Sequence, residues 1–420
     1  MLPGHASRPH QKGRELAPTW RALLHDNPLF RRWSREVRAA CGVCAIIPDY
    51  PPEKLDIKLV IEPYDLETLN ALKRLELRAP FEIIVAPDVG PRTKPKALNA
   101  ALPFARGTFT VVFDAEDRPE PDQLRRAVAA FMADDHDLAC VQARLTIDNT
   151  EDSWLARLFT AEYATQFDLF LPGIARLGLP LPLGGSSNHF RSDALRQAHA
   201  WDSYNVTEDA DLGMRLARFG YRASVIDSTT YEEAPAYFAP WLRQRTRWFK
   251  GWLQTWFVHM RRPLQLWREL GTAGFLTFQL VVGGSVLAAL IHPVFFGWFV
   301  YAIAAGQPIA DINGTPSVLI LLFGMAWAAG YFVTVVLALR ALARRGLLSS
   351  ARALVFVWVH WLLLSMAAWR AAIQLVRDPH RWEKTEHGLA KNSRLAKIAS
   401  AAALRRVLRG AQSPRRGRTA

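Results

Sequence analysis

The apolar residues between about 55 and 230 follow two different periods. Runs of β-branched and aromatic residues predict four strands, at 57–61, 82–86, 109–113 and 223–227. Apolar residues at i, i+4 and i+7 predict two helices, one through Leu124, Val128 and Phe131 and one through Leu212, Leu216 and Phe219. Strands that alternate with helices indicate an α/β sheet, and such sheets bind ligands beyond the carboxyl ends of their strands.

Beyond this region the pattern changes to long apolar segments. Two of them, 272–304 and 316–339, are long enough to cross a bilayer, which needs about 20 apolar residues. A third segment, 353–376, contains His360 and Arg370.

Arginines predict how these segments are oriented. They flank the outer ends of the first two segments: Arg261, Arg262 and Arg268 before the first, and Arg340, Arg344, Arg345 and Arg352 after the second. The connection 306–315 has neither lysine nor arginine. Because positive flanks stay in the cytoplasm, two crossings place both flanks inside and 306–315 outside. A third crossing would place the basic tail outside, so we expect 353–376 to lie in the interface, although its apolarity leaves three or four crossings open.

Charge and cysteine content narrow the possible partners. The formal net charge of +14 and the pI of about 10.0 favour an anionic partner: nucleic acid, anionic lipid or a phosphorylated substrate. Much of the basic charge flanks apolar segments and no groove-reading motif occurs, so we expect no nucleic-acid partner. Cys41 and Cys44 form a lone C-x-x-C pair, which is weak support for a metal site, and no signal peptide is expected.

Two acidic clusters are candidates for chemistry. The stretch V-V-F-D-A-E-D places Asp114, Glu116 and Asp117 directly after a predicted strand, where carboxylates suit Mg²⁺ or Mn²⁺ that bridges substrate phosphates. A solvated acidic turn explains the same residues equally well. The stretch V-T-E-D-A-D places Glu208 and Asp209 at a helix start, where acids favour the helix dipole but one could also act as a general base.

Three further stretches mix cations, polar groups and aromatic rings. Lys94 and Lys96 precede a helical run and are either phosphate ligands or surface lysines. The Gly/Ser-rich stretch 183–195 either shapes an acceptor pocket or joins two elements. The stretch R-Q-R-T-R-W-F-K-G-W, 243–252, could contact nucleic acid, a membrane surface, or a sugar and a diphosphate.

The order of these motifs is more specific than any one of them. K-P-K-A-L-N, D-A-E-D, G-G-S-S-N-H-F, T-E-D and Q-R-T-R-W precede the apolar segments. Over about 55–390 the sequence thereby resembles the membrane-integrated, inverting family-two glycosyltransferases of the cellulose-synthase-like kind. The resemblance implies an α/β fold with a GT-A-type, Rossmann-like catalytic domain, followed by C-terminal transmembrane and interfacial helices.

The same resemblance implies roles for individual residues. Asp114 is expected to be the first carboxylate of a D-x-D element that holds Mg²⁺ or Mn²⁺, with Glu116 or Asp117 as the second. Asp209, beside Glu208, is expected to be the general base. The remaining expected contacts are Asp65, Lys94, Asp114 and Arg247 for the nucleotide-sugar, Gln244, Trp248, Ser187, Asn188 and His189 for the acceptor, and Trp382 and Thr385 for a gating loop.

These expectations divide the chain into four parts. They are a divergent N-terminal segment that is disordered or truncated, 1–44, a catalytic domain, 45–265, a membrane region, 266–376, and a gating-loop-like segment with a basic tail, 377–420. The expected activity is transfer of a sugar, from a UDP-linked donor, to a growing β-linked polysaccharide by a multi-pass inner-membrane protein whose catalytic domain is cytoplasmic. The alternatives are transfer of one sugar to a lipid carrier and a catalytically impaired, truncated homologue that retains binding.

Overall fold

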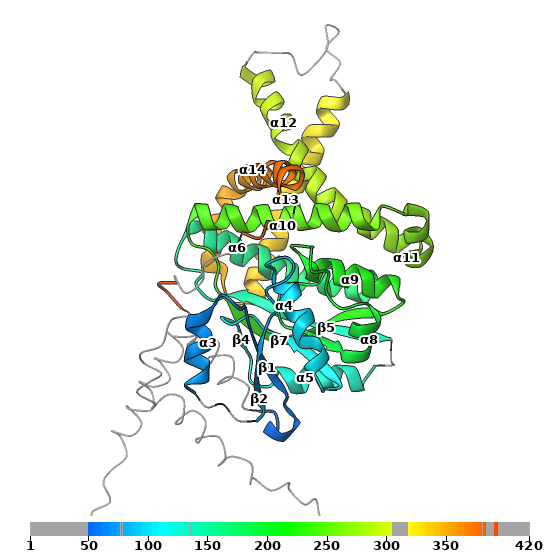
Figure 1. Ribbon diagram of the computed structural model, residues 1–420. Coiled ribbons are helices and arrows are strands. Elements are labelled where there is room, and N and C mark those ends of the chain that lie inside the picture. Colours follow the sequence, from blue (N-terminus) through cyan, green and yellow to red (C-terminus); the bar gives the residue numbers. More distant parts are fainter. Residues whose placement is uncertain are drawn as a thin grey trace, which may run out of the picture.

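The structure is a computed structural model that describes residues 49–304, 318–379, 381–383 and 390–393, apart from residues 76, 78, 135 and 136. Cys41, Cys44, Thr385 and nearly all of the basic tail lie outside these residues, so the expectations that concern them stay predictions. Figure 1 shows an α/β unit beneath a layer of long helices, with two helices rising beyond that layer.

The strands form two sheets. The larger is mixed, in the order β3 (Phe109–Val112), β6 (Asn188–Arg191), β5 (Leu138–Ile147), β7 (Arg222–Glu232) and β4 (Arg118–Pro119). Within it β5 and β7 are parallel, and the other pairs are antiparallel. The smaller sheet pairs β1 (Ile57–Ile61) in parallel with β2 (Phe81–Val85), Ile57 opposite Phe81.

The sequence pattern located four of these strands and missed the most buried one. Strands lie at or within one residue of 57–61, 82–86 and 109–113, and β7 extends beyond 223–227 at its carboxyl end. The central strand β5 has the sequence L-A-C-V-Q-A-R-L-T-I, and its register shifts at Ala143/Arg144. At this point the extra residues lie on β7, and β5 itself is buried on both faces, so no alternation of apolar and polar residues is visible in it. Strand β6 lies inside the stretch 183–195 that was expected to be a turn.

Helices cover the sheets on both sides. The first of them along the chain are η2 (Pro52–Lys54), α3 (Leu66–Lys73), α4 (Lys94–Ala101), η3 (Leu102–Phe104) and α5 (Gln123–Met132). They are followed by α6 (Trp154–Thr165), η4 (Gln166–Phe170), α7 (Leu171–Arg176), α8 (Ser192–Gln197) and α9 (Glu208–Arg218). The two predicted helices are confirmed as α5 and α9, and Gly220, with φ of 81°, follows the second. The main core packs β5 and β6 against α6 and α10, with Phe159, Phe190 and Trp241 buried.

The C-terminal helices begin with α10 (Phe238–His259), which lies across the α/β unit (Figure 1). It is followed by α11 (Pro263–Phe278), η5 (Gln279–Gly284), α12 (Ser285–Ala304), α13 (Val318–Arg344), η6 (Leu348–Phe356) and α14 (Val357–Arg377). Gly271 has φ of 66° inside α11, so the chain changes direction there. Helices α12 and α13 extend beyond the layer that contains α10 and α14 (Figure 1).

Three helical stretches are long and apolar enough to cross a membrane: Pro263–Tyr301, Gly324–Arg344 and Leu348–Arg377. In the apolar part of the third stretch, 39% is buried inside the protein, against 22% and 17% in the other two stretches. It packs against α10 and α12. This burial is compatible with the interfacial position expected for 353–376, and the number of crossings stays a prediction.

Helix α13 is also part of the packing of the α/β unit. Ala338 and Leu342 of α13 are buried against Leu158 and Ala161 of α6, in a cluster that also includes Leu354 of η6. Directly after α13, the Arg345 guanidinium forms two hydrogen bonds of 2.6 Å with the Asp168 carboxylate. The cytoplasmic end expected for this segment is therefore attached to the sheet by apolar contacts and by an ion pair.

Candidate active site

Lys94 joins the two acidic clusters that the sequence singled out. It is the first residue of α4, and its ammonium group forms an ion pair with Asp114, which follows β3. The same nitrogen donates a 2.6 Å hydrogen bond to the Gly185 carbonyl. A Cβ atom on Gly185 would lie 3.3 Å from Asp209 Oδ2, so Asp209 approaches this backbone closely. The structure thus brings Asp114 and Asp209 to the same space, as their proposed roles require.

Asp117 holds Asp114 in place. Its carboxylate is 1% exposed, and Oδ2 accepts a 2.8 Å hydrogen bond from the Asp114 backbone N–H as well as one from the Ser186 hydroxyl. Burial and the neighbouring Asp114 carboxylate raise the pKa of Asp117 well above its usual range. Because Asp117 is committed to these contacts, Glu116 is the better candidate for the second metal-binding carboxylate.

The first turn of α9 places two acids with raised pKa values side by side. Asp209 Oδ1 accepts a 2.8 Å hydrogen bond from the Ala210 N–H, and burial raises the pKa of Asp209. Burial and the adjacent Asp209 charge raise the pKa of Glu208 to about 7, although Lys94 and Arg247 oppose this shift. Glu208 and Asp209 therefore lie within the field of two cations, Lys94 and Arg247, which favour their charged forms.

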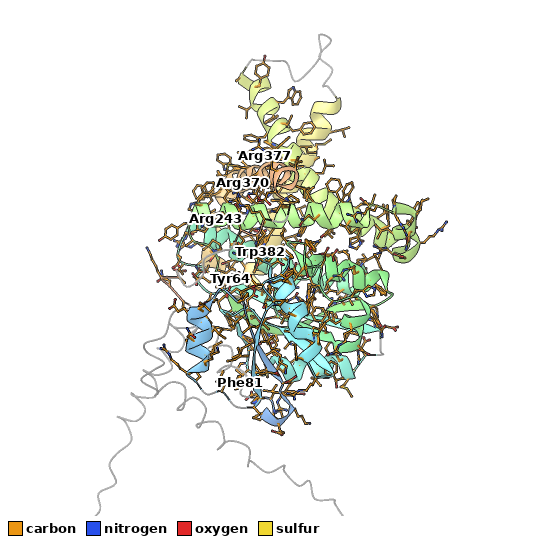
Figure 2. All side chains as sticks on the ribbon, viewed as in Figure 1. Tyr64, Phe81, Arg243, Arg370, Arg377 and Trp382 are labelled. Carbon is orange, nitrogen blue, oxygen red and sulfur yellow. The ribbon has the colours of Figure 1, made fainter. Side chains whose placement is uncertain are left out.

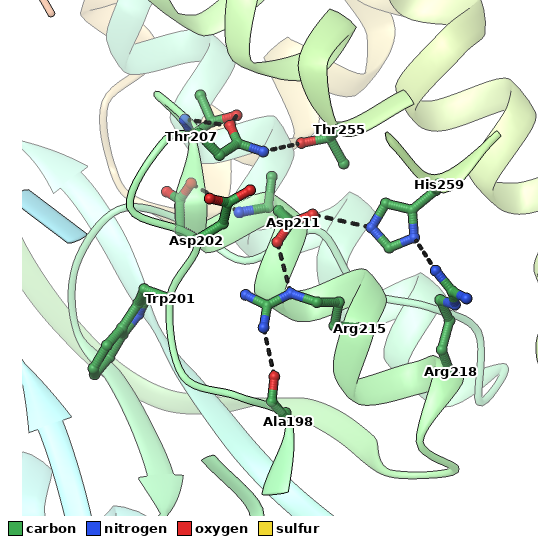
Figure 3. Close-up of polar contacts among 12 residues, drawn as sticks. Ala198, Trp201, Asp202, Thr207, Asp211, Arg215, Arg218, Thr255 and His259 are labelled. Atoms are coloured by element: carbon green, nitrogen blue, oxygen red, sulfur yellow. Dashed lines mark hydrogen bonds and ion pairs between the residues drawn. The ribbon is translucent and has the colours of Figure 1, made fainter. Parts of the chain in front are cut away.

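Asp211, two residues further along α9, is engaged elsewhere (Figure 3). Its carboxylate accepts hydrogen bonds from Arg215 Nε at 2.7 Å and from His259 Nε2 at 3.0 Å. Arg218 NH1 lies 3.1 Å from His259 Nδ1, and since a guanidinium only donates, Nδ1 accepts and Nε2 carries the proton. These buried contacts fix α9 to the end of α10, and they separate the structural acid, Asp211, from the candidate base, Asp209.

A glycine allows α10 to approach the start of α9. A Cβ atom on Gly251 would lie 2.3 Å from Thr207 Oγ1 and 2.7 Å from the Thr207 nitrogen, distances that no side chain tolerates. Beside this contact, Asn205 donates to Thr255 Oγ1 at 2.9 Å and accepts from the Thr207 N–H at 2.9 Å (Figure 3). The glycine in R-W-F-K-G-W is therefore a packing requirement of the site, which its sequence context alone did not reveal.

Residues 378, 379 and 381–383 lie against α10, beside Arg247. The Arg247 guanidinium lies 4.8 Å from the centre of the Trp382 ring. Lys250, fully buried, donates to the Arg381 carbonyl at 2.7 Å, and Gln254 donates to the Pro379 carbonyl at 2.9 Å. Next to Trp382 in the sequence, the Glu383 carboxylate accepts hydrogen bonds of 2.7 Å from both terminal guanidinium nitrogens of Arg370. Trp382 lies below the helix layer near Arg370 in the view of Figure 2.

Trp248 lies in a stack of aromatic rings and one cation. The Arg245 guanidinium lies 4.6 Å from the Trp248 ring and 4.3 Å from the Phe159 ring. The Tyr163 ring is parallel to Trp248, with an interplanar angle of 11°. Glu162 fixes Arg245 through two 2.6 Å hydrogen bonds. Trp248 is half-buried, so its orientation is set before any acceptor binds.

Four of the residues expected to contact the acceptor are buried in the protein. Ser187, Asn188 and His189 are buried at or in β6, where Ser187 Oγ donates to Thr230 Oγ1 at 2.7 Å. Burial lowers the pKa of His189 to about 4, so the ring is neutral. Gln244 is also buried. The acceptor contacts of these residues stay predictions, and a role in supporting the site is closer to what their burial shows.

Two residues near the N-terminal sheet have local roles. Asp65 caps α3, where its Oδ1 accepts a 3.1 Å hydrogen bond from the Thr68 N–H. Lys96 donates to Glu62 Oε2 and to the Pro87 carbonyl, both at 3.0 Å. Of the two lysines in K-P-K, only Lys94 therefore pairs with Asp114, and the nucleotide contact of Asp65 stays a prediction.

Glu232 is a member of the site that the sequence analysis missed. It ends β7, and burial together with the charges of Asp114 and Glu116 raises its pKa to about 8. A hydrogen bond from Tyr163 opposes that shift. The signal was present in T-T-Y-E-E-A-P, because acids that follow a strand had already singled out Asp114. It was overlooked because β7 was expected to end near residue 227.

We call the six acids and two cations at this place the carboxylate cluster: Lys94, Asp114, Glu116, Asp117, Glu208, Asp209, Glu232 and Arg247. Its acids raise the pKa values of Asp117 and Glu232, so the cluster carries more negative charge than its cations offset. Carboxylate oxygens suit a hard divalent cation, and Asp114 with Glu116 fits an ion that completes its coordination with diphosphate and water. Within the described residues, no group of three or more His, Cys, Asp or Glu forms a closed metal cage.

The family of the chain follows from a comparison with family models. The model described as "Glycosyl transferase family group 2" matches residues 109–373, more than half of the chain. The chain belongs to this glycosyltransferase family. The matched residues include most of the carboxylate cluster, the R-Q-R-T-R-W stretch and the membrane region.

Individual relatives of this glycosyltransferase are distant. It is 24% identical over 242 residues to the "Probable glycosyltransferase YdaM" of Bacillus subtilis, covering 56% of this chain and 57% of that protein. It is 31% identical over 144 residues to the "Probable glucomannan 4-beta-mannosyltransferase 1" of Arabidopsis thaliana, covering 34% of this chain and 26% of that protein. It is 26% identical over 250 residues to the "Beta-monoglucosyldiacylglycerol synthase" of Synechocystis, covering 58% of this chain and 51% of that protein. The chain thus spans about half or less of the length of these relatives.

A solved structure shows the same fold. The mannosyltransferase PcManGT from Pyrobaculum calidifontis, in complex with GDP-Man and Mn²⁺, superposes with a TM-score of 0.53 and 19% identity, over 82% of this chain and 85% of that one. The expected GT-A-type catalytic fold, followed by apolar helices, is thereby confirmed.

The Gly251 contact yields a direct prediction for this glycosyltransferase. Gly251→Ala should lower the apparent melting temperature, because the added methyl group forces α10 away from Thr207, and overpacking of this kind costs about 1–3 kcal/mol. The matched control is Gly173→Ala in α7, where nothing lies within 4 Å of the added atom. Equal melting temperatures for both variants would contradict the close contact.

Glu232 yields a prediction about pH. Its pKa in the folded protein, about 8, exceeds the ordinary value of 4.5 for a glutamate, so its contribution to stability is complete below pH 4.5 and is lost as the pH rises to 8. Without divalent ions, Glu232→Gln should therefore lose less stability than wild type between pH 5 and 8, by up to about 1.4 kcal/mol per pH unit. Thermal melts at several pH values test this, and parallel curves would remove Glu232 from the buried cluster.

Proposed function

We propose that the chain transfers a sugar from a nucleotide-sugar to an acceptor hydroxyl with inversion at the anomeric carbon. The observation that supports this most is the link from Asp114 through Lys94 and the Gly185 carbonyl to Asp209. The link supports the proposal because Asp114, which would act on the donor diphosphate through a divalent ion, lies near Asp209, which would act on the acceptor hydroxyl.

On the donor side, Asp114 and Glu116 would hold Mg²⁺ or Mn²⁺, which neutralises diphosphate charge when bound. Lys94 and Arg247 face the same space and would offset the negative charge that develops on the leaving nucleoside diphosphate. Asp117 keeps the Asp114 backbone in place. We propose UDP as the nucleotide, and a panel of UDP- and GDP-linked sugars tests that choice.

On the acceptor side, Asp209 would take the proton of the attacking hydroxyl. A carboxylate whose pKa is raised by burial is a stronger base than one in water, which brings it nearer to the pH at which the enzyme works. The Ala210 N–H fixes one oxygen, Oδ1. Trp248 would present a pre-oriented ring face to an acceptor sugar.

The acceptor we propose is a growing β-linked polysaccharide. This proposal is supported by the printed names of the glucomannan mannosyltransferase relatives and by the apolar helices beside the site. The second candidate is a lipid acceptor, because another relative is named a β-monoglucosyldiacylglycerol synthase. Product analysis separates them, since a polymer stays in the aqueous or insoluble fraction and a glycolipid is extracted into organic solvent.

The general base is tested by Asp209→Asn. Turnover should fall by roughly 10²–10⁴-fold, the usual range for lost general base catalysis, while the affinity for nucleoside diphosphate changes little. Asp193→Asn, an acid on α8 that is not part of the carboxylate cluster, is the control. Unimpaired turnover in a folded Asp209→Asn protein would remove Asp209 from the base role.

The topology is tested by cysteine labelling in intact cells. We propose a multi-pass inner-membrane protein with its catalytic domain in the cytoplasm, where nucleotide-sugars are found. In a background with Cys41 and Cys44 replaced by serine, Gly314→Cys should react with an impermeant reagent and Leu348→Cys should not. Leu348 is 54% exposed, so a lack of reaction reports sidedness, whereas the neighbouring Ser350 is only 1% exposed. The opposite labelling pattern would contradict the topology.

A further inference from the structure

A second polar cavity lies away from the carboxylate cluster. Its volume is about 470 Å³, and it is lined by residues of β5, β7, η4 and the end of α13: Arg144, Thr146, Asp168, Thr229, Tyr231, Arg344 and Arg345. None of these residues has a role in the proposed transfer reaction. The cavity lies where the membrane helix α13 meets the sheet.

The cavity and the catalytic site use opposite faces of strand β7. Arg144 pairs with Thr229, and Thr146 with Tyr231, so these side chains form neighbouring pairs on one face. The intervening residue Thr230 accepts a 2.7 Å hydrogen bond from Ser187, and Glu232 belongs to the carboxylate cluster. Because successive side chains of a strand point to opposite faces, the cavity lies across the sheet from the catalytic site.

Positive charge exceeds negative charge in this cavity. Three arginines line it together with a single acid, Asp168, among the residues that the structure describes. Arg345 occupies both carboxylate oxygens of Asp168 at 2.6 Å. Arg144 Nε lies 4.0 Å from the same carboxylate, so Arg345 is the closer partner, and Arg344 forms no ion pair with a carboxylate in the described part of the chain.

Arg144 and Arg344 both have donor groups at the cavity that no buried carboxylate of the described residues hydrogen-bonds. Arg144 forms a 2.7 Å ion pair with Asp227, whose side chain is 83% exposed, so water screens that pair. Arg144 Nε is buried and has no hydrogen-bond partner in the described part of the chain. The Arg344 guanidinium is exposed and donates to the Asp168 backbone carbonyl at 3.1 Å rather than to a carboxylate.

We propose that this cavity binds a phosphate-bearing anion that joins α13 to the catalytic sheet. Guanidinium groups present paired donors that match phosphate oxygens, and the threonine hydroxyls on the wall supply neutral donors. The anion is either the head group of an anionic phospholipid, which the end of a membrane helix can reach, or free phosphate from the cytoplasm. Both share the same chemistry, and binding should strengthen the attachment of α13.

The test uses the full-length protein in detergent with EDTA present. Binding of inorganic phosphate is measured by calorimetry, and retention of added phosphatidylglycerol or phosphatidylcholine by native mass spectrometry. Arg344→Gln should weaken binding by roughly tenfold or more, because one charge-assisted donor is lost. Arg340→Gln is the matched control, since Arg340 is exposed on the same helix one turn earlier and does not line the cavity. Arg144→Gln is the second variant, with the same expected loss.

Each result has a defined meaning. Binding of phosphate alone identifies the soluble source, binding of phosphatidylglycerol alone identifies the head group, and either one supports the site when Arg344→Gln weakens it and Arg340→Gln does not. The proposal is overturned if neither probe binds the wild-type protein, or if Arg344→Gln binds as tightly as wild type. Equal losses in Arg344→Gln and Arg340→Gln would also overturn it, because they would show a diffuse charge effect at the helix end.

Discussion

The ion pair between Lys94 and Asp114 is the interaction on which the site depends. The carboxylate cluster contains six carboxyl groups, and negative charges that lie close together repel one another. Lys94 offsets part of that repulsion, and its bond to the Gly185 carbonyl sets how close the loop before β6 comes to Asp209. Burial lowers the pKa of Lys94, but the charges of Asp114 and Glu208 raise it by more than that. The net pKa is raised, so the lysine stays charged. Lys94 thereby links Asp114 to the loop beside Asp209, and Arg247 is the second cation that interacts with Asp114 and Asp209.

Helix α10 connects the carboxylate cluster to the apolar C-terminal helices. Gly251 lets the helix contact Thr207 at the start of α9, and His259 binds Asp211 one turn into α9. From the same helix, Arg247 reaches the carboxylate cluster, and Lys250 holds the backbone of the segment that ends in Trp382. Helix α14 packs along α10, so the carboxylate cluster and the apolar helices share one supporting helix.

Much of this could be predicted from local sequence, and the remainder depends on long-range contacts. Strand β1 and helix α9 follow their apolar periods, and the acids after β3 are visible as a cluster. Strand β5 was missed because it is buried on both faces and so shows no alternation, and Glu232 because β7 is longer than its apolar run. The roles of Lys94 and Asp209 were predicted from the order of the motifs, which resembles that of family-two glycosyltransferases. The hydrogen bond from Ser186 to Asp117 and the cavity between β5 and α13 are formed by residues far apart in the sequence, so no local pattern predicts them.

The central claim is a single displacement with Asp209 as the base, and the configuration of the product tests it most directly. The anomeric coupling of the first-formed product can be read by proton nuclear magnetic resonance, starting from an α-linked nucleotide-sugar with a gluco configuration. A β-linked product is predicted, because one attack from the Asp209 side displaces a diphosphate held at Asp114 and Lys94 on the other side. An α-linked product would contradict the account, since retention needs a different arrangement of the attacking group.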